Sequence, residues 1–267
     1  MRAVSGDSIP IAARLMGPFA RCNRRRRKGA FCATDLDALL RTEAQRALRP
    51  HSRRNKTTLM PADPTPLVSR APVIPVLTIE RAADAVPLAR ALLAGGLPVI
   101  EVTLRTQAAL GAVTAIATQV PDCVVGVGTV TRAADIAAAI AAGARYLVSP
   151  GTPADLAEAL AEASAPALPG CATVSEAMAL AARGFKVLKF FPAEASGGIA
   201  WLKSVAAPLP GITFCPTGGI DGRNAAAYLA CPNVLAIGGS WVAPKDKLAA
   251  QDFAAITVLA RQAAALR

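Results

Sequence analysis

This chain of 267 residues has a single histidine, His51, which lies in its first quarter. The rest of the chain therefore has no histidine for a Ser-His-Asp or Cys-His nucleophile, or for a metal site with histidine ligands. Six cysteines are present, but they form no CxxC pair and no short repeated spacing. This pattern disfavours a disulfide scaffold and a zinc site, and it is typical of a protein of the reducing cytoplasm.

Long apolar runs and a dinucleotide-binding glycine motif are also lacking. No uncharged apolar run approaches the ~20 residues that a membrane-spanning helix needs. Gly126 and Gly128 supply only half of the pattern GxGxxG, and no glycine follows the first predicted strand at residues 78–80. The sequence therefore predicts no membrane span and gives no support to a nucleotide-binding open sheet.

Net positive charge is confined to the start of the chain. Residues 1–60 hold 14 Lys and Arg against 4 Asp and Glu, whereas residues 61–267 hold 15 against 14. The basic run of residues 24–28 is compatible with nucleic-acid contact or targeting. It lacks interleaved aromatic residues and a recognisable binding fold, which argues against a specific nucleic-acid role. We predict that residues 1–66 are a basic, disordered extension ending in a Pro-rich linker, with Met60 as an alternative start.

From residue 73 onward, short β-rich apolar runs alternate with Ala- and Leu-rich stretches of helical periodicity. The eight apolar runs are residues 73–77, 99–104, 124–130, 146–150, 165–168, 187–191, 213–216 and 234–237. Eight strand-helix repeats in about 200 residues predict an α/β fold, a compact (β/α)8 TIM barrel over residues 67–267. A doubly wound open sheet is the alternative, but it normally uses fewer strands and favours a glycine fingerprint.

A single lysine, Lys189, lies in the apolar and aromatic run of residues 187–191. Side chains alternate between the two faces of a strand, so Lys189 shares one face with Val187 and Phe191. Burial disfavours the charged form of an amine, and only a neutral amine attacks a carbonyl carbon. The run therefore predicts a nucleophilic lysine inside the barrel. The alternative is a lysine at a strand end whose ammonium reaches solvent.

On the second predicted strand, Glu101, Thr103 and Arg105 alternate with apolar residues. The apolar face must pack on helices, so the polar row points into the barrel, where it is costly unless its members meet each other or a ligand. Chemistry in this fold lies at the carboxyl ends of the strands, and Thr129 and Pro150 end the third and fourth. The alternative is an exposed strand end with a Glu–Arg pair.

The last two predicted strands each end in a pair of glycines, Gly218 with Gly219 and Gly238 with Gly239. Loops after strands seven and eight of such barrels commonly bind phosphate, because bare backbone N–H groups can approach an anion closely. One glycine pair is only a turn in most proteins. Two pairs at these two strand ends favour a phosphate pocket.

Seven short motifs occur in order along the chain. They are EVTLRT (101–106), VGVGTV (125–130), SPG (149–151), TVSE (173–176), KFFPAE (189–194), FCPTGGI (214–220) and IGGSW (237–241). Over residues 72–262 their order and spacing resemble the 2-keto-3-deoxy-6-phosphogluconate (KDPG) aldolases, a family that also acts on 4-hydroxy-2-oxoglutarate (KHG). The resemblance implies a lyase: a homotrimeric barrel and a class I aldolase, which forms a Schiff base without a metal or other cofactor.

The matching motifs imply roles for single residues. Lys189 would form the imine, Glu101 would be the general base, and Arg105 would bind the pyruvate carboxylate. The further substrate-binding residues that the resemblance implies are Thr129, Pro150, Phe191, Thr217, Gly218, Gly219, Gly239 and Ser240. Two departures from the family pattern, at Val127 and at residues 171–172, leave the fine substrate preference open.

The expected reaction is cleavage of KDPG to pyruvate and glyceraldehyde 3-phosphate in the Entner-Doudoroff pathway, with KHG as a further substrate that gives pyruvate and glyoxylate. The sequence leaves the gluco and galacto epimers of the phosphosugar open. The nearest alternative is another phosphosugar-binding barrel enzyme, which does not need a lysine buried beside aromatic residues. A non-catalytic sugar-phosphate sensor with a basic arm would instead show salt-sensitive binding to nucleic acid.

Removal of residues 1–59 should leave cleavage activity intact, because the predicted barrel and every predicted site residue lie beyond residue 66. The measurement compares kcat/KM for pyruvate release in the full chain and in a chain that starts at Met60, with circular dichroism as the control for folding. A truncated chain that is inactive or unfolded contradicts the prediction.

Overall fold

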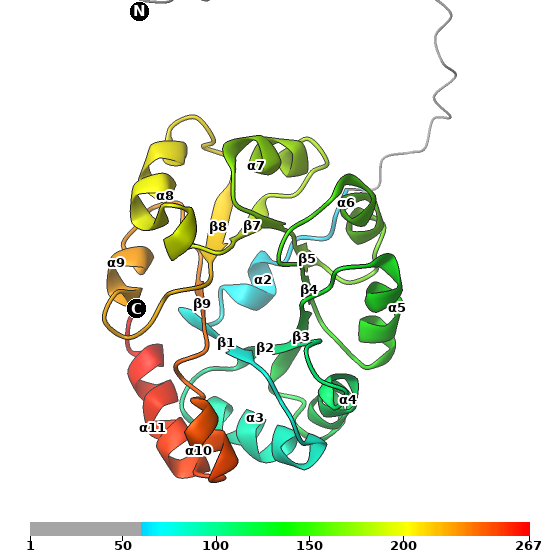
Figure 1. The fold of residues 1–267 in the computed structure, drawn as a ribbon, viewed down its shortest axis with the longest axis vertical. Helices are drawn as coiled ribbons and strands as arrows, with labels where there is room; N and C mark the ends of the chain where they lie inside the picture. The colour runs from blue at the N-terminus through cyan, green and yellow to red at the C-terminus, as the bar shows by residue number, and fades with distance from the viewer. Residues whose placement is uncertain (1–59) are drawn as a thin grey trace, which may run out of the picture. The chain divides into compact units, whose positions relative to one another are not determined.

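The computed structural model describes residues 60–267, an α/β body in which helices surround parallel strands (Figure 1). The strands are β1 (Val73–Leu77), β2 (Val99–Thr103), β3 (Val124–Gly128), β4 (Leu147–Val148), β5 (Ala167–Leu168), β6 (Gly170–Cys171), β7 (Val187–Phe190), β8 (Thr213–Pro216) and β9 (Ile237–Gly239). They form a curled six-stranded sheet in the order β5-β4-β3-β2-β1-β9 and a three-stranded sheet in the order β6-β7-β8. Residues 1–59, with His51 and the basic run, lie outside the described residues.

Helices alternate with the strands, as the periodicity predicts. They are α2 (Thr65–Val68), α3 (Ala85–Ala94), α4 (Ala109–Gln119), α5 (Ala133–Ala141), α6 (Ala154–Ala161), α7 (Val174–Ala181), α8 (Gly198–Ala206), α9 (Ala225–Leu229), α10 (Lys245–Ala249) and α11 (Phe253–Ala264). Two 3-10 turns, η2 (Ala82–Asp84) and η3 (Glu194–Ser196), follow β1 and β7. Within residues 60–267 no helix is long and apolar enough to cross a bilayer.

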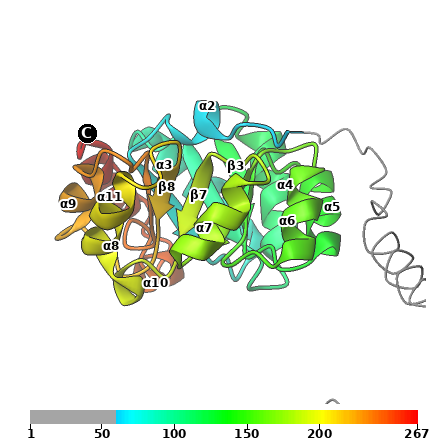
Figure 2. The same cartoon turned by 90° about the horizontal axis from the view of Figure 1, so that it is seen from above.

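The core has two layers, which follow from the alternation of side chains along each strand. Val99 and Val187 belong to an inner cluster, whereas Ile100 and Leu188 belong to the larger cluster between strands and helices. This confirms the predicted inward face of β2 and β7. Val68 of α2 joins the inner cluster, and α2 lies over the middle of the strands in Figure 1 and at the top edge of the body in Figure 2. Helix α2 therefore closes the amino ends of the strands.

The fifth predicted strand, residues 165–168, is reduced to β5 at Ala167–Leu168, and a second two-residue strand, β6, which the sequence did not predict, follows Pro169. β5 pairs with β4, and β6 pairs with β7. Proline has no backbone N–H to donate to a neighbouring strand, which explains the interruption. The carbonyl of Pro169 still accepts a hydrogen bond from the Lys189 N–H at 3.0 Å.

Three further predicted strands differ from the observed ones by two or three residues at an end, while residues 99–104 and 187–191 each extend one residue beyond β2 and β7. The fourth, residues 146–150, is reduced to β4 at Leu147–Val148. β3 stops at Gly128 because Thr129 adopts a left-handed φ of 63°, which does not fit a strand. The eighth, residues 234–237, starts three residues too early: Val234 makes only an isolated bridge to Phe214, and pairing of β9 with β1 begins at Ile237.

The Pro-rich stretch that the sequence suggests as a linker lies against the body. Met60 and residues 61–64 line a hollow together with Ala167 and Phe185, and Pro64 is buried. Helix α2 then begins at Thr65, within the same stretch. From residue 60 onward the chain therefore packs against the body and is not a free linker.

Glycine at position 126 is required by a large side chain. A Cβ there would lie 2.2 Å from the ring of Tyr146, which is fully buried and donates its hydroxyl to Ile100 O at 2.8 Å. Burial raises the pKa of Tyr146 well above its usual value, so the hydroxyl stays a donor. The tyrosine fills the inner layer only because β3 has no side chain at this point.

Gly126→Ala should lower the free energy of unfolding by about 1–3 kcal/mol, the usual cost of overpacking a core. Gly111→Ala on α4 is the matched control: its Cβ would meet nothing within 4 Å, and alanine favours a helix interior over glycine by about 0.5–1 kcal/mol. Urea unfolding of both variants measures the effects. Equal stability of the two variants would contradict the assignment of the Tyr146 contact.

Candidate active site

Lys189 and Glu101 form an ion pair in the interior. They come from β7 and β2, 88 residues apart in sequence, and Lys189 Nζ lies 3.1 Å from Glu101 Oε1. Only 5% of Lys189 and 4% of Glu101 is exposed. Lys189 Nζ also lies 5.3 Å from the centre of the Phe191 ring, within the range of a cation–π contact. The ammonium therefore does not reach solvent, which excludes the exposed strand-end alternative.

Aromatic packing behind β7 fixes the position of this lysine. Phe190 points to the opposite face and stacks on Trp201 of α8 with ring centres 4.2 Å apart. Trp201 in turn meets Phe214 of β8 edge-on at 5.3 Å. Such pairs stabilise by about 0.5–1.5 kcal/mol beyond the area that they bury. The strand that carries Lys189 is thus anchored to both α8 and β8.

Glu101 occupies space that β3 leaves open. A Cβ on Gly128 would lie 1.9 Å from Glu101 Oε1 and 2.6 Å from its carboxyl carbon. Any side chain at position 128 would therefore push the carboxylate out of its place beside Lys189. The two glycines of β3 have separate functions, since Gly126 admits Tyr146 and Gly128 admits Glu101.

Thr103 and Arg105, the other two residues of the predicted polar row on β2, do not pair with Glu101. Thr103 is fully buried, and its hydroxyl donates to Leu77 O at 2.9 Å on β1. Arg105 lies beyond the end of β2, is exposed, and makes no ion pair with any residue of 60–267. The alternative of a Glu101–Arg105 pair is therefore wrong, and Arg105 has a free guanidinium at the carboxyl end of β2.

Thr129 and Pro150 follow the ends of β3 and β4, and both are half-buried. Close packing fixes Pro150: a Cβ on Gly170 would lie 2.4 Å from the carbonyl group of Pro150. The hydroxyl of the fully buried Ser149 accepts the Gly170 N–H at 3.1 Å. Ser149 thus connects the β4 end to β6.

The glycine pairs after β8 and in β9 have different surroundings. Gly218 and Gly219 form a turn, whereas Gly238 and Gly239 make room for neighbours. A Cβ on Gly238 would lie 2.2 Å from Thr217 Oγ1, and one on Gly239 would lie 1.7 Å from the Trp241 ring. Close packing of Trp241 therefore already requires glycine at 239. Ser240, between them, is exposed.

Cysteine is not a competing nucleophile here. Cys215 lies beside Lys189 in the β7–β8 register, and burial, with a further contribution from Glu101, raises the pKa of its thiol to about 12. Burial likewise raises the pKa of Cys171 to about 12. Because the thiolate is the reactive form, these two groups are inert at neutral pH. The amine of Lys189 is therefore the candidate nucleophile among these buried groups.

The family model described as KDPG and KHG aldolase matches residues 66–259. The chain belongs to this aldolase family. It is 51% identical over 197 residues to the 2-dehydro-3-deoxy-phosphogluconate aldolase of Pseudoalteromonas atlantica, covering 74% of this chain and 92% of that one.

Solved structures of aldolases give the same assignment. The KDPG aldolase of Legionella pneumophila, with pyruvate captured at low pH as a covalent carbinolamine intermediate, has a TM-score of 0.75 and 41% identity over 76% of this chain and 98% of that one. The Zymomonas mobilis KDPG aldolase with 3-phosphoglycerate has a TM-score of 0.71 and 48% identity over 76% of this chain and 96% of that one.

Sequence reasoning missed several residues that shape the candidate site. Gly128 appears in the sequence only as half of a nucleotide-binding fingerprint, and Ser149 only as part of the SPG motif. Asn224, which contacts the glycine turn after β8, belongs to none of the seven motifs. Only the pairing of β2 with β3, combined with the inward face of Glu101, could have revealed the function of Gly128.

Gly128→Ala should reduce aldolase turnover by about 10²–10⁴-fold, the range for loss of general acid–base catalysis, because the new methyl group displaces the Glu101 carboxylate. Glu101→Gln should show a loss of similar size, whereas Gly111→Ala should keep the wild-type rate. The measurement is kcat for pyruvate release, with thermal unfolding to show that each variant is folded. A folded Gly128→Ala variant with normal kcat would contradict the proposed placement of the carboxylate.

Proposed function

We propose that this chain is a class I aldolase that cleaves KDPG to pyruvate and glyceraldehyde 3-phosphate. The observation that carries the proposal is the buried pair of Lys189 and Glu101. A retro-aldol cleavage through an imine needs an amine nucleophile and a nearby group that accepts and returns protons. In this pair Lys189 Nζ and Glu101 Oε1 lie 3.1 Å apart in the buried space that the strands surround.

The first half of the reaction forms the imine. Glu101 takes a proton from Lys189, and the neutral amine attacks the C2 ketone of the substrate to give a carbinolamine. Glu101 returns the proton to the departing hydroxyl group, water leaves, and a protonated imine remains between Lys189 and C2. The cationic imine is an electron sink for the bond cleavage that follows.

The second half breaks the carbon–carbon bond. Glu101, again a carboxylate, removes the proton of the C4 hydroxyl, the C3–C4 bond breaks, and its electron pair moves into the imine to give an enamine and an aldehyde. Glu101 then protonates C3, and hydrolysis of the imine releases pyruvate and restores the amine of Lys189. One carboxylate thus serves as base and as acid in turn.

The remaining predicted residues hold the two ends of the substrate. Arg105 supplies a free, planar guanidinium that suits a bidentate bond to the carboxylate. Thr129 and Pro150, which follow the ends of β3 and β4, complete the pyruvate end, and Phe191 lies near Lys189. The phosphate end lies at a set of residues that follow β8 or stand at the end of β9. They are Thr217, Gly218, Gly219, Gly239 and Ser240.

KHG is a further substrate in this proposal, because its 2-keto acid part is the one that Lys189 and Glu101 process. The gluco epimer is the proposed phosphosugar, since the similar enzymes described above bear that name. A synthase or isomerase of phosphosugars does not need the buried Lys189–Glu101 pair.

We also propose a closed eight-stranded barrel over residues 67–267, in which β5 and β6 are halves of one strand. Isolated bridges from Phe214 to Val234 and from Thr217 to Gly238 support closure between β8 and β9. The assembly that the family resemblance implies is a homotrimer in the cytoplasm. Size-exclusion chromatography with light scattering tests the trimer.

Borohydride reduction in the presence of pyruvate should attach a pyruvate-derived group to Lys189, because reduction traps the imine. Peptide mass analysis locates the adduct, and Lys189→Ala is the control that should carry none. A folded protein without an adduct, or with an adduct on Lys186 instead, would overturn the proposed mechanism.

A further inference from the structure

The turn formed by Thr217, Gly218 and Gly219 has all three of its carbonyl groups bound on the protein side. Ala193 N–H donates to Thr217 O at 2.8 Å, and Glu194 N–H donates to Gly218 O at 3.1 Å. The third carbonyl, Gly219 O, accepts from the side-chain amide of Asn224 at 3.0 Å. The first two donors belong to the turn after β7, so the segment that follows Lys189 also shapes the turn after β8.

The backbone N–H groups of the two glycines in this turn have no such partners. Neither Gly218 N–H nor Gly219 N–H makes a hydrogen bond within the part of the chain that the structure describes. Both residues adopt left-handed backbone angles, with φ of 101° and 77°, which glycine adopts at little cost. Successive N–H groups in such turns form concavities that bind anions. The turn therefore has two free N–H donors, whereas its three carbonyl acceptors are already bound.

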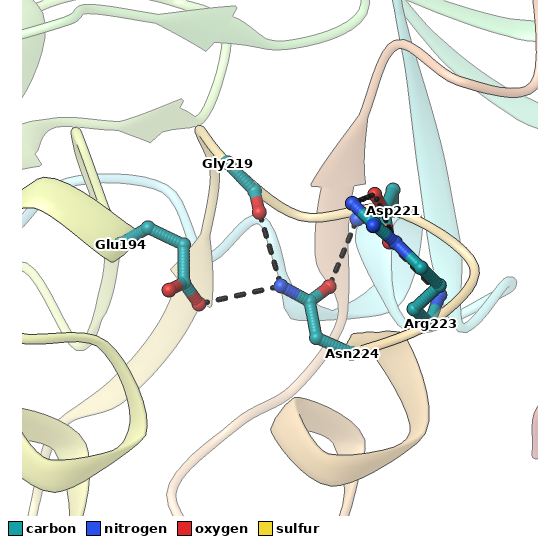
Figure 3. Close-up of polar contacts among 5 residues, drawn as sticks. All are labelled: Glu194, Gly219, Asp221, Arg223 and Asn224. Atoms are coloured by element: carbon teal, nitrogen blue, oxygen red, sulfur yellow. Dashed lines mark hydrogen bonds and ion pairs between the residues drawn. The ribbon is translucent and has the colours of Figure 1, made fainter.

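Asn224 is the side chain that joins this turn to its surroundings (Figure 3). Its amide nitrogen donates to Gly219 O and, at 3.3 Å, to Glu194 Oε1. Its amide oxygen accepts the Asp221 N–H at 2.9 Å. One residue at the start of α9 thus holds the glycine turn, the following loop and the turn after β7.

Glu194 gives Asn224 a fixed partner. Its Oε1 also accepts the hydroxyl of Tyr228, which is fully buried in α9. Burial first, and the bond to this carboxylate second, raise the pKa of Tyr228, so the hydroxyl remains a donor. The stem of Glu194 packs directly against the turn, since a Cβ on Gly219 would lie 2.6 Å from its Cβ and Cγ.

We propose that Asn224, held by Glu194, is a positioning residue that fixes the carboxyl end of the glycine turn through Gly219 O, and so keeps the turn in the conformation that presents the Gly218 and Gly219 N–H groups to the substrate phosphate. It thereby sets the preference for phosphorylated over unphosphorylated 2-keto acids. The inference rests on the proposed aldolase function. It adds that selectivity depends on a turn held from behind. The peptide groups that carry the Gly218 and Gly219 N–H have their oxygens bound by Ala193 N–H and Glu194 N–H, and Asn224 fixes the next peptide group through Gly219 O.

Asn224→Ala should lower the ratio of kcat/KM for KDPG to kcat/KM for KHG by about 10-fold, as loss of a hydrogen bond to a charged group would predict. The loss should appear as a higher KM for KDPG, with kcat for KHG unchanged, because the chemistry at Lys189 is untouched. Glu194→Ala should lower the same ratio. Glu194→Gln keeps an oxygen that accepts from Asn224 and Tyr228, so this variant should retain most of the wild-type ratio.

Arg223→Gln is the matched control beside Asn224. Arg223 pairs with Asp221 at the surface and contacts neither Gly219 nor Glu194 (Figure 3). Its removal should change the ratio by less than about 2-fold, as for a surface ion pair. If Arg223→Gln lowers the ratio as much as Asn224→Ala, cationic charge rather than turn geometry provides the selectivity, and the proposal is wrong.

Trapping with pyruvate and borohydride separates this inference from the proposed function. Absence of an adduct in the wild-type chain means that the aldolase mechanism itself fails. An adduct in the wild type and in both alanine variants, combined with an unchanged KDPG to KHG ratio, overturns the positioning role alone. Two variants at different positions keep the test informative if one of them does not fold.

Discussion

Two opposite charges share the interior of this protein, and burial of each depends on the other at 3.1 Å. Removal of one member of such a pair leaves an uncompensated charge, which typically costs about 3–5 kcal/mol. The pair joins β2 to β7, which belong to the two different sheets. Lys189 and Glu101 therefore constrain the arrangement of the sheets as well as supplying the proposed chemistry, and a substitution that removes either group affects both.

The glycines show what surrounds this pair. Gly128 leaves the space that Glu101 fills, and Gly126 leaves the space for Tyr146 one layer below. Gly238 does the same for Thr217. Each of these side chains reaches across to a neighbouring strand that is bare at that point. Interiors of this density have little room for relaxation, so the large inward side chains determine where the neighbouring strands must carry glycine.

Simple periodicity predicted the face of every catalytic candidate on β2 and β7, because alternation along a strand depends on nothing beyond the strand itself. Strand ends were less predictable. They depend on Pro169, whose missing N–H divides one strand into two, and on the left-handed backbone of Thr129. Neither effect changes the hydrophobic pattern. The pairing of Lys189 with Glu101 across 88 residues likewise required the fold, since periodicity gives a direction but no partner.

Periodicity likewise gave no partner for Asn224, whose contacts come from other segments of the chain. These contacts also show a difference between the two ends of the proposed site. The proposed chemistry depends on strand side chains, and packed aromatic rings hold the strand of Lys189 in place. The proposed phosphate selectivity depends instead on backbone groups of Gly218 and Gly219, which have no side chains. Such a turn must be held from outside, by Glu194, Asn224 and the backbone of the turn after β7. Binding energy from a remote phosphate positions the reacting end of a substrate. Because the turn after β7 follows Lys189 by only a few residues, one short segment connects the proposed phosphate contact to the proposed nucleophile.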